Sequence, residues 1–394
     1  MQLERVLIPR RVRGFDDGRP DAQAYDVRLD GDRVAAVSPA DGPAQGMLLS
    51  ALVDAHVHLD KNYTVGQVGA AQGDLFAAIT RMAQARAHWS GPDLRARMTR
   101  ALEDAWQSGT RAMRTHLDWN ERDAPLSLGV FEALRDAWAG RIELQCVSLT
   151  PLDLFAGASA GEDIAREVAR AGGVMGAFVY RNADLEPKLR RVFELARQNG
   201  LALDFHVDEG LHADANGLAL IAELAVRMGM AGQVSCSHCC SLSVQPEAQA
   251  QATLAGCARA GLHLVALPTT NLYLQGAWDR TPVERGITRL REAAGHGLRG
   301  CIATDNVADG FYPYGSYDLL ETFGLGVQVA HLAPATDWLD AITTSPARAM
   351  GLAWDGRIAP GCPADLVHLQ ARDEFELLGP TGRRRTVIRA GRPL

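Results

Sequence analysis

Two histidines at the end of an apolar segment are the first residues in this chain whose spacing points to chemistry. His56 and His58 lie in the run 52–59, which is typical of a buried strand that ends there. Successive side chains of a strand point to opposite faces, so these two imidazoles leave the same face. Two imidazoles on one face can form half of a metal site. A chance pairing among the 11 histidines of the chain is the alternative.

Later segments supply candidates for the missing ligands. His206 lies at the end of the strand-like stretch 201–207, and Asp305 directly follows the segment 298–304. A buried carboxylate costs free energy unless a cation pairs with it, although Asp305 could instead cap a helix. The segment 173–180 has no lysine that could bridge two ions, so we predict one divalent metal ion, Zn²⁺ or Fe²⁺. Its predicted ligands are His56, His58, His206 and Asp305.

Two further side chains could act on a water molecule at such a metal ion. Glu209 lies three residues after His206, close enough to reach the same cavity. A carboxylate beside a metal-activated water is the usual proton carrier, and the alternative for Glu209 is a solvated loop acid. His238 ends the segment 233–238, and as a neutral ring it could exchange a hydrogen bond with the attacking hydroxide. Asp305 could also take a proton from the water.

Cysteines surround His238 in the sequence. Cys236, Cys239 and Cys240 could form a thiolate zinc site, but the chain has no second cysteine pair at a suitable spacing. Buried structural thiols are the interpretation that we favour.

These residues need a scaffold that brings strand ends together. Strand-like segments alternate with helical ones such as 93–106 and 187–198, and Asn199-Gly200 stops the second of these. Eight alternations are typical of a parallel (β/α)8 barrel, an α/β fold with its active site at the carboxyl ends of the strands. A doubly wound sheet is the rival, but no glycine-rich phosphate loop follows the first strand. The predicted strands are 47–58, 112–117, 143–149, 173–180, 202–207, 233–238, 263–267 and 298–304.

The two ends of the chain differ from its middle. Residues 26–37 alternate around Asp30-Gly31, a strong signal for a β-hairpin, and short strand-like pieces return at 356–367 and 386–391. We therefore predict a small β-sandwich domain from residues 1–50 and 355–394. The barrel domain then occupies residues 51–354.

Composition narrows the class of protein. The chain has 394 residues, a net charge of −7 and a pI near 5.9, so it offers no basic footprint for nucleic acid or an anionic membrane. No apolar run reaches the length of a membrane helix, and the N-terminus lacks the features of a signal peptide. Seven cysteines in so long a chain do not indicate a disulfide framework. We expect a cytoplasmic protein.

Several segments, taken as an ordered set, resemble the amidohydrolase superfamily and, within it, the cytosine deaminase branch. The resemblance covers about 52–352, and the segment 361–367 is similar to the closing β segment of the superfamily. The segments that carry it are His56-Val57-His58-Leu59-Asp60, Arg114-Thr115-His116-Leu117-Asp118, His206-Val207-Asp208-Glu209, Ser237-His238, 271–276, 285–289, and Asp305-Asn306-Val307 followed by Phe311-Tyr312-Pro313.

This resemblance implies a (β/α)8 barrel with a β-sandwich from both termini. It also implies hydrolytic deamination of an amino-substituted nitrogen heterocycle, such as a cytosine-like pyrimidine, a triazine or a pterin, by attack of a metal hydroxide with release of ammonia. In this scheme Glu209 carries a proton to the ring nitrogen, His238 holds the hydroxide, and Gln275 lies near the substrate. The same four metal ligands are implied: His56, His58, His206 and Asp305.

Two positions depart from the pattern of cytosine deaminases. The region 148–153 lacks the glutamine that reads the pyrimidine edge, and Asn306 replaces a second aspartate. Changing a hydrogen-bond partner can alter selectivity by orders of magnitude, so these departures argue against cytosine itself. Lys61 points to an anionic or carbonyl-rich substrate, unless it is a surface lysine. The predicted substrate contacts are Gln275, Asn306, Lys61 and Phe311.

The prediction is therefore a mononuclear metal-dependent deaminase with a small heterocyclic substrate, and assembly into a homo-oligomer is left open. One alternative is hydrolysis of a cyclic amide or an N-alkyl amine by the same site. A second is a non-catalytic metal- or ligand-binding barrel, which would have no use for a proton carrier such as Glu209.

Overall fold

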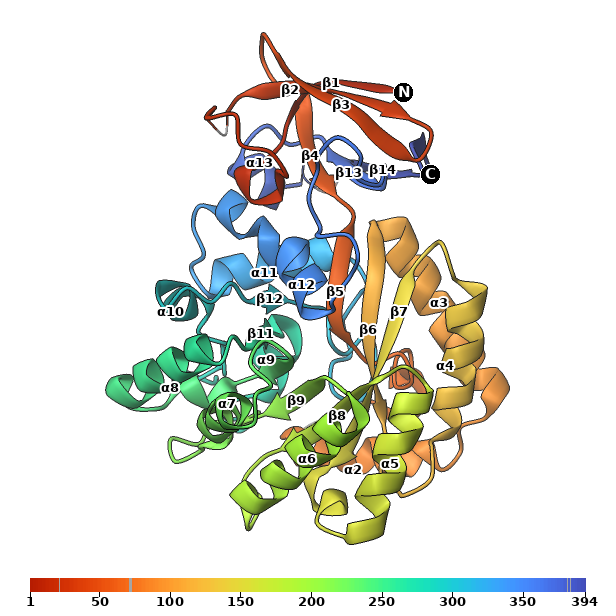
Figure 1. Ribbon diagram of the computed structural model, residues 1–394, viewed down its shortest axis with the longest axis vertical. Coiled ribbons are helices and arrows are strands. Elements are labelled where there is room, and N and C mark those ends of the chain that lie inside the picture. Colours follow the sequence, from red (N-terminus) through yellow and green to blue (C-terminus); the bar gives the residue numbers. More distant parts are fainter. Residues whose placement is uncertain (21, 71–72, 381, 383) are drawn as a thin grey trace.

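Eight parallel strands form the central sheet of the molecule. The structure, a computed structural model, describes residues 1–394 except 21, 71–72, 381 and 383. The strand order β12-β11-β10-β9-β8-β7-β6-β5 follows the chain. A parallel bridge between Val57 and Asp305 brings the end of the last strand to the first, so the sheet is a nearly closed barrel, as predicted (Figure 1). The strands are β5 (Leu52–Val57), β6 (Thr110–Asp118), β7 (Glu143–Pro151), β8 (Val174–Val179), β9 (Leu203–Val207), β10 (Val234–His238), β11 (His263–Ala266) and β12 (Cys301–Ile302).

Helices connect the barrel strands and cover the outside of the sheet (Figure 1). The longest one shows why they form: Ser90 accepts a hydrogen bond from Asp93 N at its start, and Gly109, at φ 108°, ends it. The helices are α1 (Val65–Val68), α2 (Leu75–Arg86), α3 (Gly91–Ser108), α4 (Leu126–Ala137), α5 (Ala158–Arg170), α6 (Leu185–Asn199), α7 (Gly217–Arg227), α8 (Glu247–Arg259), α9 (Pro268–Leu274), α10 (Leu290–Gly295), α11 (Leu319–Val329), α12 (Thr344–Ala349) and α13 (Glu374–Leu378). Short 3-10 helices span Arg10–Val12, Leu152–Phe155, Cys240–Ser243 and Ala335–Ile342.

Strands from both ends of the chain form a separate sheet, as predicted. Hydrogen bonds join them into one continuous seven-stranded sheet of order β15-β14-β13-β4-β1-β2-β3. The predicted hairpin is β2 and β3, with Gly31 in its turn at φ 55°. The strands are β1 (Gln2–Leu7), β2 (Ala24–Asp30), β3 (Arg33–Ala40), β4 (Gly46–Ser50), β13 (Leu366–Leu369), β14 (Arg385–Arg389) and β15 (Arg392–Pro393).

One predicted strand, 47–58, is two strands in the structure. Ser50 of β4 pairs with Leu366 of the terminal sheet, whereas Leu52 of β5 pairs with Thr110 of the barrel. Between them, Ala51 N donates to the carbonyl oxygen of Asp365 over 2.9 Å. The apolar run is continuous because both strands are buried, so its sequence does not mark the change of partner.

The described residues form two large apolar cores. One lies between the barrel strands and the helices around them, from Leu94 of α3 to Leu254 of α8. The other joins strands of the terminal sheet to Phe323 of α11 and Leu339 near the amino end of the barrel. The terminal sheet therefore packs at the end of the barrel where β5 begins (Figure 1). Among the described residues, no helix has the length and apolar character to span a bilayer.

Candidate active site

The predicted metal ligands meet at the carboxyl end of the barrel. His56 lies in β5, His58 follows that strand, His206 lies in β9, and Asp305 follows β12. Asp305 N donates to the carbonyl oxygen of His56 over 2.9 Å, so the bridge that closes the barrel also places this carboxylate. All four side chains are buried, with at most 4% exposure.

The donor atoms of His56, His58 and Asp305 are spaced as they would be around one cation, and His206 adjoins them through His58. The Nε2 atom of His58 lies 3.3 Å from the Nε2 atoms of both His56 and His206. Oδ1 of Asp305 lies 3.3 Å from His56 Nε2 and 3.2 Å from His58 Nε2. Ligands about 2.0–2.1 Å from a zinc ion in tetrahedral geometry are roughly 3.3 Å apart. The spacing of His56, His58 and Asp305 therefore fits a single ion, and His206 belongs to a second, overlapping group with His56 and His238.

Hydrogen bonds on the far side of the rings show which nitrogen carries the lone pair. Nδ1 of His58 lies 3.1 Å from the carbonyl oxygen of His116, which can only accept, so Nδ1 bears the proton and Nε2 is free to bind a metal. Nδ1 of His56 lies 2.9 Å from Oγ of Ser237. Neither carboxylate oxygen of Asp305 has a hydrogen-bond donor among the described residues. Converging lone pairs and an unpaired buried carboxylate suit a divalent cation.

The ionisation of this cluster supports the same conclusion. Burial lowers the pKa of His58 to about 4 and that of His206 well below its usual value, so both rings are neutral, as metal ligands must be. Burial alone would raise the pKa of Asp305, but the close contacts of its carboxylate with His56 and His58 outweigh burial and hold the pKa well below its usual range. Asp305 is therefore a carboxylate.

His238 points an unpaired nitrogen at the cluster. Its Nδ1 lies 3.0 Å from Oδ1 of Asn271, whose own Nδ2 donates to the carbonyl oxygen of Gly286 over 3.1 Å. Asn271 is thereby fixed as an acceptor, so His238 carries its proton on Nδ1 and has a lone pair on Nε2. This Nε2 is buried without a partner among the described residues. With His56 and His206, this ring forms one of the groups of described residues that could hold a metal ion.

Glu209 is a buried carboxyl group beside His238, not a solvated loop acid. Its Oε1 lies 3.4 Å from His238 Nδ1, and the side chain lines the cavity described below. Burial, helped by the negative charge of Asp305, raises the pKa of Glu209 well above its usual value. A carboxyl group with a raised pKa can both take and give a proton near neutral pH.

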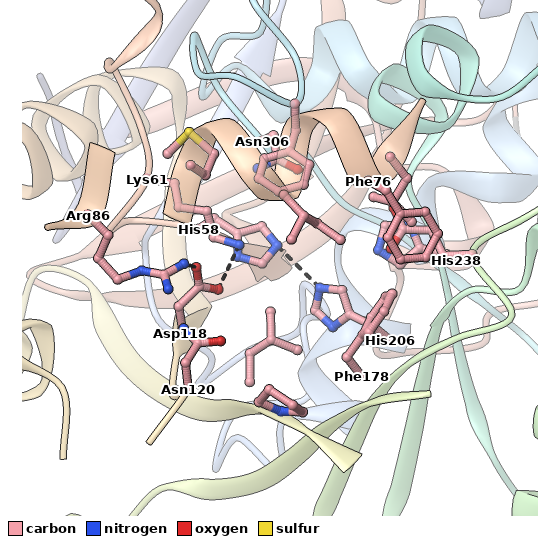
Figure 2. Close-up of a pocket in the computed structure, with 17 residues that line it drawn as sticks. His58, Lys61, Phe76, Arg86, Asp118, Asn120, Phe178, His206, His238 and Asn306 are labelled. Atoms are coloured by element: carbon pink, nitrogen blue, oxygen red, sulfur yellow. Dashed lines mark hydrogen bonds and ion pairs between the residues drawn. The ribbon is translucent and has the colours of Figure 1, made fainter. Parts of the chain in front are cut away.

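A cavity of about 240 Å³ lies against His58, His206 and His238 (Figure 2). Phe76 of α2 and Phe178 of β8 give it aromatic walls. Helix α2 forms much of the lining, with side chains that recur at helical spacing on one face. These α2 residues are Leu75, Phe76, Ile79, Met82 and Arg86. A cavity of this size with aromatic walls suits a flat ring.

Charged groups occupy one end of the cavity. Lys61 Nζ lies 2.8 Å from Oδ1 of Asp118, and Arg86 pairs with the other oxygen of the same carboxylate (Figure 2). Burial alone would lower the pKa of Lys61, but the carboxylates of Asp118 and Asp60 raise it above its usual value. Lys61 is only 4% exposed, so it is not a surface lysine, and Asp118 balances its charge.

The four predicted substrate contacts do not all lie in the cavity. Lys61, Asn306 and Phe311 line it. Gln275 is not among its lining residues, and its contact with a substrate stays a prediction. Its Nε2 donates to the carbonyl oxygen of Glu209 over 2.8 Å, so Gln275 supports the loop that carries Glu209.

Some residues of the site had no signal of their own in the sequence. Asn271 and Gln275 belong to a segment noted for its resemblance, but nothing in their spacing showed what they contact. Asp118, at the end of β6, could have been suspected as an acid that ends an apolar strand, like Asp305. The thiols of Cys236, Cys239 and Cys240 are buried and free, and the possible metal groups among the described residues contain only histidine and aspartate.

Comparison with known proteins places the chain in a family. A family model described as "Amidohydrolase family" matches residues 75–394. The chain belongs to the amidohydrolase family. It is thus a hydrolase, and the resemblance noted in its sequence is confirmed.

Individual relatives cover nearly the whole chain. A pterin deaminase from Rhizobium rhizogenes is 38% identical over 375 residues, which are 94% of this chain and 86% of the relative. The crystal structure of 5-methylcytosine deaminase from Klebsiella pneumoniae, liganded with phosphonocytosine, has a TM-score of 0.85 and 26% identity, and the match covers 100% of this chain and 98% of that one. N-isopropylammelide isopropylaminohydrolase from Burkholderia multivorans has a TM-score of 0.77 and 27% identity, with 99% and 98% covered.

Proposed function

We propose that this protein is a metal-dependent deaminase that releases ammonia from an amino-substituted nitrogen heterocycle, with a pterin as the first substrate to test. The observation that carries the proposal is the position of Glu209, a buried carboxyl group that lines the same cavity as the histidine cluster. A site that only bound metal would not need this group. The 38% identity to a pterin deaminase supports the choice of ring.

In this proposal His56, His58, His206 and Asp305 hold one divalent ion, zinc or iron. Imidazole and carboxylate ligands suit both metals. The ion would lower the pKa of a water molecule enough for it to act as a nucleophile near neutral pH. Strand β8, where a bridging lysine would be needed for a second ion, contains no lysine.

The side chains of the site account for the protons of the reaction. His238 Nε2 accepts a hydrogen bond from the attacking water and orients it toward the amino-bearing carbon. Glu209 takes a proton from that water and passes it to the ring nitrogen, which prepares the carbon for addition. Asp305 then accepts the remaining hydroxyl proton and gives it to the departing amine. The C–N bond breaks, ammonia leaves, and a carbonyl group remains on the ring.

The test is a screen for ammonia release. The purified protein, loaded with zinc or with ferrous iron, is offered pterin, cytosine, 5-methylcytosine and aminotriazines. We expect ammonia and the corresponding oxo product from pterin. No ammonia from any of these rings, in a sample shown to contain metal, would contradict the proposal.

A second candidate is hydrolysis of an N-alkyl amine on the same kind of ring. The observation in its favour is the structural similarity to N-isopropylammelide isopropylaminohydrolase from Burkholderia multivorans. The leaving group distinguishes the two candidates, because deamination releases ammonia whereas an N-alkylated ring releases an alkylamine. Opening of a cyclic amide ring would release neither. Product analysis on N-isopropylammelide and on pterin in parallel separates these activities.

A further inference from the structure

The cavity presents two polar side chains that the proton transfers do not use. Asn306 and Lys61 both line it. They belong to the loops after β12 and β5, and these loops run side by side. Tyr63 N donates to the carbonyl oxygen of Val307 over 3.1 Å, and Val65 N donates to that of Ala308 over 2.9 Å. A bound ring that reaches the metal ligands would meet both side chains from neighbouring loops.

Asp309 determines which atom of Asn306 is available to a ligand. Asn306 Nδ2 donates to Oδ2 of Asp309 over 2.7 Å. Oδ1 of Asp309 accepts from the backbone nitrogens of Phe311, at 2.8 Å, and Tyr312, at 3.0 Å. A carboxylate has only acceptor atoms, so the amide nitrogen of Asn306 must face it. Within the described residues Asn306 Oδ1 accepts no hydrogen bond, and this oxygen is the atom offered to a ligand.

Lys61 is held in a corresponding way, but as a donor. Its Nζ lies 2.8 Å from Oδ1 of Asp118 and 4.9 Å from the centre of the Phe311 ring. An ammonium group has three N–H donors and no acceptor. Asp118 is the hydrogen-bond acceptor that Lys61 Nζ contacts among the described residues, so donors remain for a ligand. Figure 2 shows Lys61 reaching Asp118 from the side opposite to Arg86.

We propose that Asn306 and Lys61 together recognise a cyclic amide on the substrate ring, with Asn306 Oδ1 accepting from the ring N–H and Lys61 Nζ donating to the neighbouring carbonyl oxygen. The inference rests on the proposed deaminase function and narrows its substrate class to amino-oxo heterocycles. Asp309 and Asp118 are positioning residues that fix the acceptor and the donor.

The proposed pair would reject rings with the opposite hydrogen-bonding pattern. A diamino ring carries a lone pair where the amide has N–H, and an amino group where the amide has a carbonyl. It would bring acceptor against acceptor and donor against donor, and would leave buried polar groups unpaired. Pterin and 2,4-diaminopteridine differ in this way while they share the same bicyclic frame.

The test compares the binding of these two ligands, so that it does not depend on turnover. Calorimetric dissociation constants are measured for the zinc-loaded Glu209→Gln protein and for the same protein with Lys61→Met, Lys61→Arg or Asn306→Leu added. We expect the parent to bind pterin at least about tenfold more tightly than 2,4-diaminopteridine. Lys61→Met and Asn306→Leu should each reduce this ratio to within about threefold, and Lys61→Arg should retain most of it.

The binding comparison and the ammonia-release screen can fail independently of each other. An unchanged ratio in both Lys61→Met and Asn306→Leu, or no preference in the parent, would overturn the inference, as would failure of both ligands to bind. If one variant does not fold, as judged by circular dichroism and metal content, the other still decides. A clear preference for pterin without ammonia release by the wild-type protein would support amide recognition and contradict the deaminase function.

Discussion

Glu209 is the residue that should separate metal binding from catalysis. Replacing it with glutamine keeps the shape of the side chain but removes the group that carries the proton. We expect Glu209→Gln to retain bound metal and to lose turnover by about 100-fold or more, the usual contribution of a general acid–base group. Metal analysis and ammonia release measured on the same sample test this, with Glu247→Gln, on the exposed start of α8, as a matched control. Wild-type turnover in Glu209→Gln would remove it from the mechanism.

At the residue scale, the candidate metal ligands could be picked out of the sequence more easily than the side chains that orient the rings of the site by hydrogen bonds. His56, His58 and Asp305 could be found because an imidazole pair at strand spacing and an acid after an apolar strand are unusual. Asn271 could not be assigned its role, because its contact with His238 joins two loops that only the barrel brings together. The contact of Gln275 with the backbone of Glu209 could not be foreseen for the same reason.

At the element scale, the first and last barrel strands are joined by few contacts, and one of these involves a buried acid. Asp54 of β5 accepts hydrogen bonds from Thr304 N, at 3.2 Å, and from Thr304 Oγ1, at 2.6 Å. Burial raises the pKa of Asp54 from 3.8 to about 6. Because the folded protein disfavours the ionised form, this group should lower the free energy of unfolding as pH rises from about 4 to about 6.

The variant Asp54→Asn should lack this pH dependence. Its free energy of unfolding relative to the wild type should increase across that interval by up to about 3 kcal/mol, and should be constant below pH 4 and above pH 6. Urea unfolding of the metal-free proteins at several pH values measures the difference. A constant difference across the whole range would show that Asp54 is not buried as an acid at this seam.

Helices and strands could be predicted where a single hydrophobic periodicity extends through a whole segment. The predicted helix 187–198 lies within α6, and the segment 143–149 within β7. The run 47–58 was not divided, because burial on both sides of Ala51 leaves no polar boundary. The contribution of α2 to the cavity was also not foreseen, since an apolar helix face does not reveal whether it packs on a core or over a ligand.

At the scale of the whole molecule, the terminal sheet and the barrel share one of the two large cores. Leu49 and Ile388 of the sheet belong to the same apolar cluster as Ile302 of β12 and Phe323 of α11. The division into residues 1–50 with 355–394 and residues 51–354 stays a prediction. Because the core crosses it, we expect both parts to unfold in one cooperative transition by differential scanning calorimetry. Two resolved transitions would contradict this expectation.

The central claim is that four residues distant in sequence hold one metal ion on which deamination depends. The most direct test is a titration of the metal-free protein with zinc, with bound metal and ammonia release from pterin followed together. We predict that activity rises in proportion to bound metal and saturates at one equivalent per chain, and that His206→Ala and Asp305→Ala neither bind this equivalent nor release ammonia. Full activity without metal, or an unchanged equivalent bound by both variants, would contradict the account.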